Sequence, residues 1–201
     1  MKGPILFALL IFPVVLYGQK DDAVKSLISK HNEINGFGAV DFKYTEIYNE
    51  KALIFGFNGG VIINKHIMLG VGGYGLTTEI EVNDDIFPPH LEGGYGGILL
   101  GVVAAPVEIV HFTFPVLLGA GSFHIVDREL DFNNFSRAIS LESSSFAVVE
   151  PGLQVEINIS KNFRFAVGST YRLIQGVSFN DINDSDLSGF TGNITFRVGK
   201  F

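Results

Sequence analysis

A period-two alternation of apolar and polar residues recurs along most of this chain, and it limits the possible folds more than any other feature. In the segment 163–173 the odd-numbered positions carry Phe, Val, Tyr and Leu, apart from Ser169, while the even-numbered positions carry Arg, Ala, Gly and Thr. Successive side chains of a β-strand point to opposite faces of a sheet, so the pattern indicates strands with one apolar and one polar face. No sustained helical period follows Gly36. The sequence therefore predicts an all-β fold.

About eight segments show this alternation or a related strand pattern. They lie near residues 36–48, 52–64, 66–82, 91–105, 109–125, 145–159, 163–176 and 188–201. Each is longer than the roughly 9–11 residues that a tilted strand needs to cross a bilayer. Tight connections at 64–66, 106–108 and 160–162 alternate with those at 49–51, 83–90, 126–144 and 177–187, most of which are longer. This asymmetry predicts a closed antiparallel up-and-down transmembrane β-barrel of about eight strands.

Charged residues and glycines share the face opposite the aliphatic residues, which favours an inward orientation for that face. An eight-stranded barrel is just wide enough for side chains to fill its interior, so we expect a salt-bridge network that plugs the lumen rather than a conducting pore. The expected neighbours in this lumen charge network are Glu150 and Glu156 with Arg164 and Arg172, and Asp41 and Lys43 with Arg197.

The N-terminus has the pattern of a secretory signal peptide. Lys2 precedes an apolar run over residues 5–15, and Gly18 is the small residue expected at a cleavage site. The run is too short for a typical transmembrane helix, which makes a membrane anchor the weaker interpretation. We therefore expect a signal peptide over residues 1–18, a periplasmic segment over 19–35 that is a short helix or disordered, and a barrel domain over 36–201.

Composition excludes several other classes of protein. The chain has no cysteine, which rules out disulfides and Cys-ligated metals. Its net charge of −7, without a basic stripe, disfavours nucleic-acid binding. A hydrophobic content of 47% excludes intrinsic disorder.

Taken together, the signal peptide, the alternating strands, the tight inner turns and the terminal aromatic residue resemble the small outer-membrane barrels of Gram-negative bacteria, of the OmpA transmembrane domain and OmpX type. The resemblance implies an outer-membrane location, contact with outer-membrane lipid, and recognition by the barrel-assembly machinery through Phe196, Val198 and Phe201. Phe201 is out of phase with the other two, so a bulge near Gly199 or a looser signal is expected. We expect a monomer.

Motifs for chemistry are weak. The run Gly70–Gly75 matches GxGxxG, but a strand and not a helix is expected after it, so it predicts no dinucleotide site. The five histidines share no metal-binding spacing, and the polar run 181–186 lacks the glycine and final glutamate of a calcium loop. We therefore predict no catalytic residue, cofactor or metal.

Two prolines, Pro115 and Pro151, fall within strands that should be neighbours, where each removes a hydrogen-bond donor. With Ile109 and Leu117 as apolar lumen candidates, a weakened seam there resembles the lipid-access gate of palmitoyl-transferring outer-membrane barrels. Bulges that accommodate the prolines are the simpler interpretation.

The predicted function is structural or interactive, with a side-chain-filled lumen and an extracellular or periplasmic ligand that the sequence does not identify. A possible contact loop contains Asp127, Arg128, Glu129, Asp131, Phe132 and Phe135. The alternatives are a small diffusion channel, a lipid-modifying enzyme with lateral access near the two prolines, and a soluble secreted lipocalin-like barrel.

Overall fold

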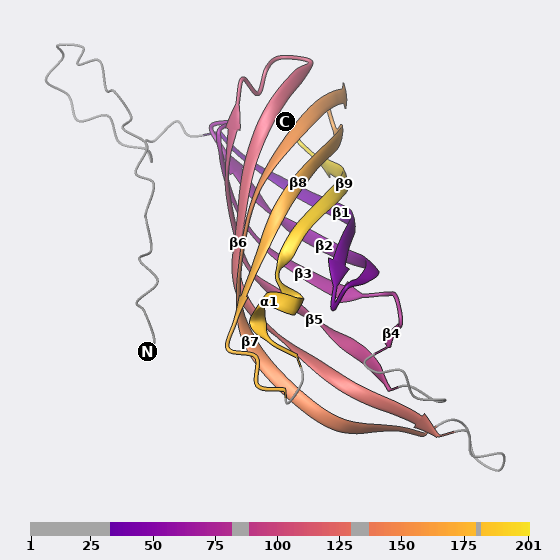
Figure 1. Cartoon of the computed structure of the whole chain (residues 1–201). Helices are drawn as coiled ribbons and strands as arrows, with labels where there is room; N and C mark the ends of the chain where they lie inside the picture. Colours follow the sequence, from indigo (N-terminus) through magenta and orange to yellow (C-terminus); the bar gives the residue numbers. More distant parts are fainter. Residues whose placement is uncertain (1–32, 82–88, 130–136, 180–181) are drawn as a thin grey trace, which may run out of the picture. The chain divides into compact units, whose positions relative to one another are not determined.

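The computed structural model describes residues 33–81, 89–129, 137–179 and 182–201, and we treat the barrel by itself (Figure 1). Its elements are β1 (Ile34–Ile47), β2 (Glu50–Ile63), β3 (Ile67–Leu76), β4 (Ile80–Glu81), β5 (His90–Ala104), β6 (Val110–Glu129), β7 (Arg137–Ser160), β8 (Phe163–Gln175), α1 (Asp184–Leu187) and β9 (Gly189–Gly199). The predicted signal peptide lies outside the described residues. Residues 19–32 of the segment expected to follow it also lie outside them. The barrel begins at Ile34, two residues earlier than predicted.

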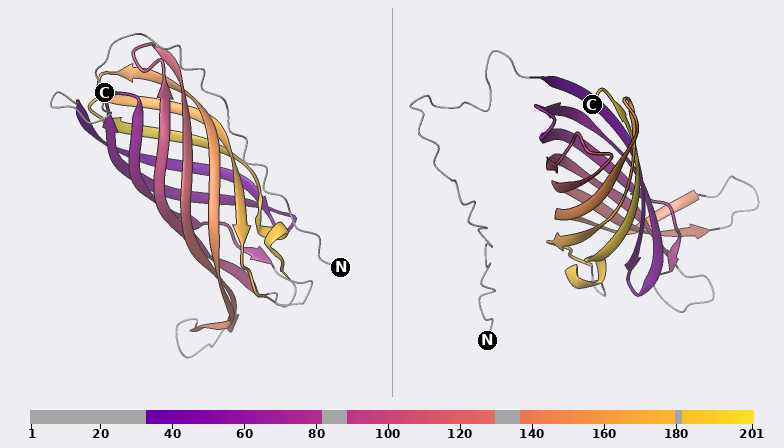
Figure 2. Two further views of the ribbon diagram at one scale, coloured as in Figure 1. Left: turned by 90° about the vertical axis from the view of Figure 1, so that its left-hand side faces the viewer. Right: turned by 90° about the horizontal axis from the view of Figure 1, so that it is seen from above.

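The sheet closes on itself. Neighbouring strands pair antiparallel in the order β3-β2-β1-β9-β8-β7-β6-β5, and β3 also pairs with β5. The two-residue strand β4 continues the β3 side of the wall and pairs with β5, so the wall has eight positions. Figure 2 shows the strands wrapping around a common axis. The predicted closed antiparallel barrel of about eight strands is confirmed. Within the described ranges, no helix is long and apolar enough to cross a membrane.

The connections differ between the two ends of the barrel. At the end that we call the turn end, strands are joined at residues 64–66, 105–109 and 161–162. At the opposite loop end, β1 and β2 meet through Tyr48 and Asn49, both with positive φ, as in a tight two-residue hairpin. The other connections at that end are longer, and the β6–β7 hairpin extends beyond the neighbouring strands (Figure 1).

The prediction of a loop over residues 126–144 is wrong, because β6 and β7 extend into this segment as a hairpin. Ladder pairs continue from Val126↔Ser140 to Glu129↔Arg137, after a one-residue register shift at Ile125/Val126. The shift reverses the alternation that marks the strand, which explains why sequence periodicity ended the strand too early. Residues 127–129 of the predicted contact loop therefore lie in β6, while Asp131, Phe132 and Phe135 lie outside the described residues.

The expectation of two bulges, at Pro115 and Pro151, is wrong. Between β6 and β7 the pairs Thr113↔Gln154 and Val116↔Pro151 lie in the same register, and the ladder between them is simply interrupted. The strand β9 also pairs without a register shift up to Gly199, so no bulge precedes the terminal residues. Phe201 instead keeps the lumen-side phase and packs, half-buried, against the interior.

The faces of the wall have the predicted orientation. In β8 and β9 the arginines and threonines are buried, whereas Val167, Tyr171 and Ile194 are exposed. The exposed apolar belt also includes Phe42, Tyr44, Leu53, Phe57, Val71, Ile98, Phe112, Phe114, Leu153, Phe190 and Phe196. The barrel is thus apolar outside and holds its charges inside.

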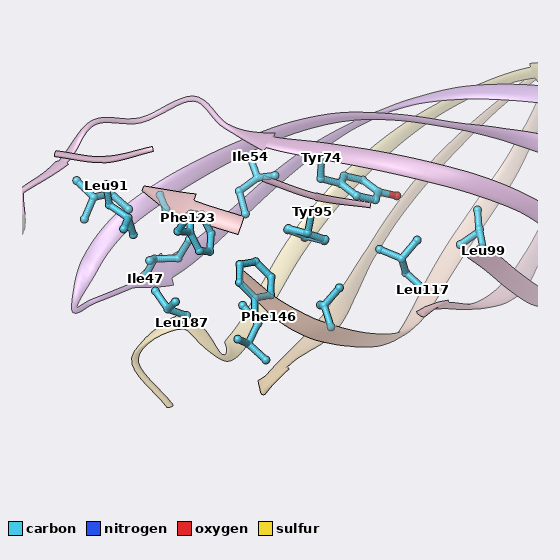
Figure 3. Packing of buried hydrophobic residues seen from close by; sticks show 14 of the residues in the cluster. Ile47, Ile54, Tyr74, Leu91, Tyr95, Leu99, Leu117, Phe123, Phe146 and Leu187 are labelled. Atoms are coloured by element: carbon cyan, nitrogen blue, oxygen red, sulfur yellow. The ribbon is translucent and has the colours of Figure 1, made fainter. Parts of the chain in front are cut away.

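A second apolar group fills part of the interior, which the sequence did not predict. Toward the loop end, Ile47, Leu91, Phe123, Phe146 and Leu187 are buried in one cluster, and the rings of Phe123 and Phe146 stack with centroids 5.1 Å apart. Figure 3 shows these side chains inside the wall at one end, with Tyr74 and Tyr95 between them and Leu99. Much of the hydrophobic content is therefore a core inside the barrel, in addition to the outward belt.

Candidate functional site

The centre of the lumen is an ion pair that crosses the barrel. Lys43 Nζ, from β1, lies 2.8 Å from Oε1 and 2.9 Å from Oε2 of Glu150, from β7. Tyr95 donates a 2.9 Å hydrogen bond to Glu150 Oε2, and Thr170 donates to Oε1. Lys43 Nζ also lies 3.5 Å from the centroid of the Tyr74 ring, a cation–π contact. Both charges are thereby compensated although both side chains are buried.

Asp41 forms a second centre, two residues from Lys43 on the same strand face. Its Oδ2 accepts hydrogen bonds of 2.9 Å from Tyr74 Oη and 2.7 Å from Asn58 Nδ2. Its Oδ1 accepts a 2.6 Å bond from Thr195 Oγ1. These donors come from β2, β3 and β9, so one carboxylate connects three other strands of the wall. Such charge-assisted bonds are among the stronger hydrogen bonds in proteins.

Glu156 forms a third centre, closer to the turn end. Its Oε2 lies 3.0 Å from His111 Nε2 and 2.8 Å from Thr113 Oγ1, and its Oε1 accepts a hydrogen bond from Arg197 Nη1. Arg164 Nη1 is 3.8 Å from Oε2, too far for a hydrogen bond but close enough for attraction. The Glu156 carboxylate therefore interacts with two arginines and a histidine.

Arg172 has a different role from the other buried cations. Its Nε donates a 2.8 Å hydrogen bond to the carbonyl oxygen of Leu187, at the end of α1, and its Nη2 lies 3.4 Å from Thr45 Oγ1. Leu187 and Ile182 are themselves buried in the apolar cluster. Segment 182–188 thus packs into the loop-end mouth, with a buried arginine bonded to its backbone.

All seven residues of the predicted lumen charge network are buried inside the barrel: Asp41, Lys43, Glu150, Glu156, Arg164, Arg172 and Arg197. Their pairing follows the expectation only in part. Glu156 and Arg164 are neighbours as expected, 3.8 Å apart, but Glu150 bonds Lys43 on β1, and Arg197 bonds Glu156 instead of the acid on β1. Side chains of a small barrel reach across the lumen as readily as along one wall, so adjacency in the sheet did not decide the pairs.

Sequence reasoning missed the neutral members of the network and His111. Tyr74 and Tyr95 lie on the Gly-rich strands β3 and β5, where the sequence predicts no member of the charge network. His111 was judged only by metal-ligand spacing. Its position two residues before Thr113, in phase with Pro115 and Leu117, is the signal that could have placed it in the lumen.

Little empty space remains among these side chains. The cavity lined by Asp41, Lys43, Tyr74 and Glu150 has about 20 Å³, enough for about one water molecule. A buried Asn58 oxygen and the Gln154 oxygen have no direct partner among the described residues, so a water there is chemically reasonable.

The two prolines lie at an interruption of the β6–β7 ladder, as expected from their missing donors. Pro115 is buried and lines the small lumen cavity, whereas Pro151 faces outward. Of the two apolar lumen candidates, Leu117 is buried, with 3% of its surface exposed. The prediction for Ile109 is wrong, because its side chain is 72% exposed in the turn before β6. The β6–β7 ladder is interrupted there, and only one of the two proposed apolar residues, Leu117, lies in the lumen.

The remaining predicted residues are placed as follows. Phe196 and Val198 belong to the exposed belt, while Phe201 lies on the lumen side, with its ring centroid 3.8 Å from the Arg164 guanidinium carbon. The GxGxxG run lies in β3, so it does not precede a helix. Asn183 caps α1, and Asp186 Oδ2 accepts a 2.8 Å hydrogen bond from the backbone N–H of Asn183, which accounts for part of the polar run at 181–186.

No protein-family model matches the sequence, and no curated protein matches it either. Solved structures do match the fold. Neisserial surface protein A (NspA) aligns with a TM-score of 0.58 and 12% identity, over 86% of this chain and all 100% of that chain. The N-terminal barrel of Pseudomonas aeruginosa OprF aligns at 0.42 and 8% identity over 81% and 96% of the two chains, and Yersinia pestis Ail at 0.39 and 16% over 83% and 95%. This chain therefore has the closed β-barrel fold that NspA adopts.

Proposed function

We propose that this chain spans the bacterial outer membrane as a side-chain-filled β-barrel, and that it supports the envelope or presents its loop end to a partner. One observation carries the proposal. The barrel is apolar outside and charged inside, the reverse of a soluble protein with a ligand-binding core.

The exposed belt supports the membrane location. Contiguous exposed apolar patches larger than a few hundred Å² mark membrane or protein contact surfaces. Here Phe42, Phe57 and Phe112 are among many large side chains that remain exposed on strands from different sides of the wall. Lipid is the environment that covers such a belt on all sides at once. A closed barrel also satisfies its backbone hydrogen bonds without water, as a bilayer requires.

The filled lumen supports a role without conduction. The Lys43–Glu150 pair crosses the middle of the barrel, and segment 182–188 packs into the loop-end mouth. Ions need a continuous polar passage, and about 20 Å³ at the centre does not provide one.

The loop end supports an interaction role. Within the part of the chain that the structure describes, the strand ends and loops there carry more acids than bases. The acids are Glu46, Glu50, Glu79, Glu81, Glu92, Asp127, Glu129, Glu142, Asp184 and Asp186, and the bases are Lys51, Arg128 and Arg137, besides the buried Arg172. A partner that binds there is therefore expected to be cationic.

Fractionation of the cells tests the membrane location. The protein is expected in the outer-membrane fraction, with a heat-dependent shift on gel electrophoresis, because small barrels stay folded in unheated detergent. Recovery in the soluble periplasmic fraction, without a gel shift, would favour the lipocalin-like alternative and contradict the proposal.

Two further measurements separate the remaining alternatives. In planar bilayers the purified barrel should show no steady conductance, and stable single-channel steps would instead support a diffusion channel. Deletion of the chain should leave the lipid A acyl pattern unchanged, whereas an altered pattern would support lateral access of lipid near Pro115 and Pro151.

A further inference from the structure

A hollow of about 270 Å³ opens at the turn end, away from the loop end that the proposed function uses. Three connections form it: the β2–β3 turn, the β5–β6 turn and the β7–β8 turn. Its lining residues are Lys65, Pro106, Val107, Asn158, Ser160, Lys161, Arg164 and Phe201. Three of the eight have cationic side chains, and none has an acidic side chain.

The cations are only partly neutralised by their neighbours. Lys65 Nζ lies 3.8 Å from Glu33 Oε2, and both side chains are partly exposed. Lys161 forms no ion pair with any residue in the described ranges. Exposed pairs at such distances contribute little, so both lysines remain available to an anion.

Arg164 supplies the buried part of the site. The residue is only 2% exposed, yet its Nε and Nη1 have no hydrogen-bond partner among the described residues. Glu156, the nearest acid, is bonded to Arg197, His111 and Thr113. Buried guanidinium donors without partners are unusual, and a ligand oxygen is one way to satisfy them.

The walls of the hollow are continuous with the apolar belt. Val107, on its rim, is 76% exposed, and Ile109 and Ile159 beside it are 72% and 59% exposed. An anion bound between the lysines would therefore have apolar surface next to it, at the level where the belt ends. This combination fits a phosphate group that is attached to hydrocarbon chains.

We propose that this turn-end hollow, lined by Lys65, Lys161 and Arg164, binds a phosphate group, and that the phosphate belongs to a phospholipid headgroup of the adjoining leaflet. The two lysines bind the phosphate oxygens. Arg164 donates hydrogen bonds from the buried, lumen side of the hollow once the Phe201 ring moves away from the guanidinium group. The source of the phosphate rests on the proposed membrane location, but the anion site does not.

A titration of the full barrel in maltoside micelles tests the proposal. Inorganic phosphate and dihexanoyl phosphatidylglycerol are added separately, and NMR follows the amides of 158–164 and the Arg164 Nε–H. Saturable shifts confined to the turn end are expected with both, at lower concentration for the lipid. The double variant Lys65→Gln/Lys161→Gln should bind the lipid at least about tenfold more weakly.

The matched control is Lys51→Gln, which removes one exposed lysine at the loop end and should leave the titration unchanged. Saturation by inorganic phosphate alone would assign the site to free phosphate and overturn the lipid source. Shifts that persist in the double variant, or no saturable shift with either probe, would overturn the site itself. Because the micelle titration does not depend on cellular location, its failure is distinguishable from failure of the fractionation experiment.

Discussion

The lumen is filled in two different ways. One is a polar network around Asp41, Glu150 and Glu156, which we call the polar half of the filling, and the other is a loop-end cluster around Leu91, Phe123 and Phe146, which we call the apolar half. Buried apolar side chains such as Ile62 and Met68 also lie near the turn end. In the polar half, Asp41, Glu150 and Glu156 each accept bonds from several strands, and each of these carboxylates depends on specific partners. In the apolar half, toward the loop end, Leu91, Phe123 and Phe146 are held by packing, which has no direction. The same alternating pattern therefore specifies two kinds of interior. We expect the apolar half to tolerate substitutions that change side-chain shape, and the polar half to be sensitive to the loss of a single charge.

The largest expected effect is in the polar half. Glu150→Gln keeps the shape of the side chain but leaves Lys43 buried without its counter-charge. Removing one partner of a buried pair costs about 3–5 kcal/mol of unfolding free energy. Urea unfolding in micelles, followed by circular dichroism, measures this loss.

The double variant Lys43→Met/Glu150→Leu is the control for that substitution. It removes both charges together and should recover most of the loss. If Glu150→Gln alone has the stability of the wild type, the ion pair does not hold the centre of the barrel.

A cavity in the apolar half comes next. Leu91→Ala removes a buried side chain that pairs with Ile80 and Ile125 across the wall, and it should cost about 2–5 kcal/mol, depending on how far the site collapses. The same urea titration measures it. An effect below that of an exposed Leu53→Ala control would show that the loop-end interior is not packed.

Arg172 connects the two halves, and its loss should be local. Arg172→Met removes the charged donor to the Leu187 carbonyl, a bond worth about 1.5–3 kcal/mol. Amide exchange is expected to accelerate in segment 182–188 and to stay unchanged in β1. Uniform acceleration throughout the barrel would contradict the assignment of Arg172 to the loop-end mouth.

The smallest expected effect sharpens the comparison most. Leu91→Met conserves volume and should cost less than about 1.5 kcal/mol. The loss of unfolding free energy in Leu91→Met is compared with the loss in Glu150→Gln, which is also close to isosteric, under the same conditions. The ratio of the two losses tests the difference between the halves. Equal losses would remove the distinction.

The strand faces were predictable, whereas the contacts across the lumen were not. Alternation placed Arg164 and Arg172 inside because a strand has only two faces. It could not show that Lys43 reaches Glu150, since that contact depends on the tilt and stagger with which the sheet closes. It also missed the extension of β6 and β7, because the register shift at Ile125/Val126 reverses the phase.

By itself, then, the sequence determined the all-β architecture, the approximate strand number and which face of the regularly alternating strands points inward, because those properties follow from local periodicity and from connection lengths. Only the tertiary structure decided that a charged network and an apolar cluster fill the interior together, that Arg172 bonds the segment packed into the loop-end mouth, and that Phe201 covers Arg164. These contacts join residues far apart in the chain, and closure of the barrel is what brings them within reach of one another.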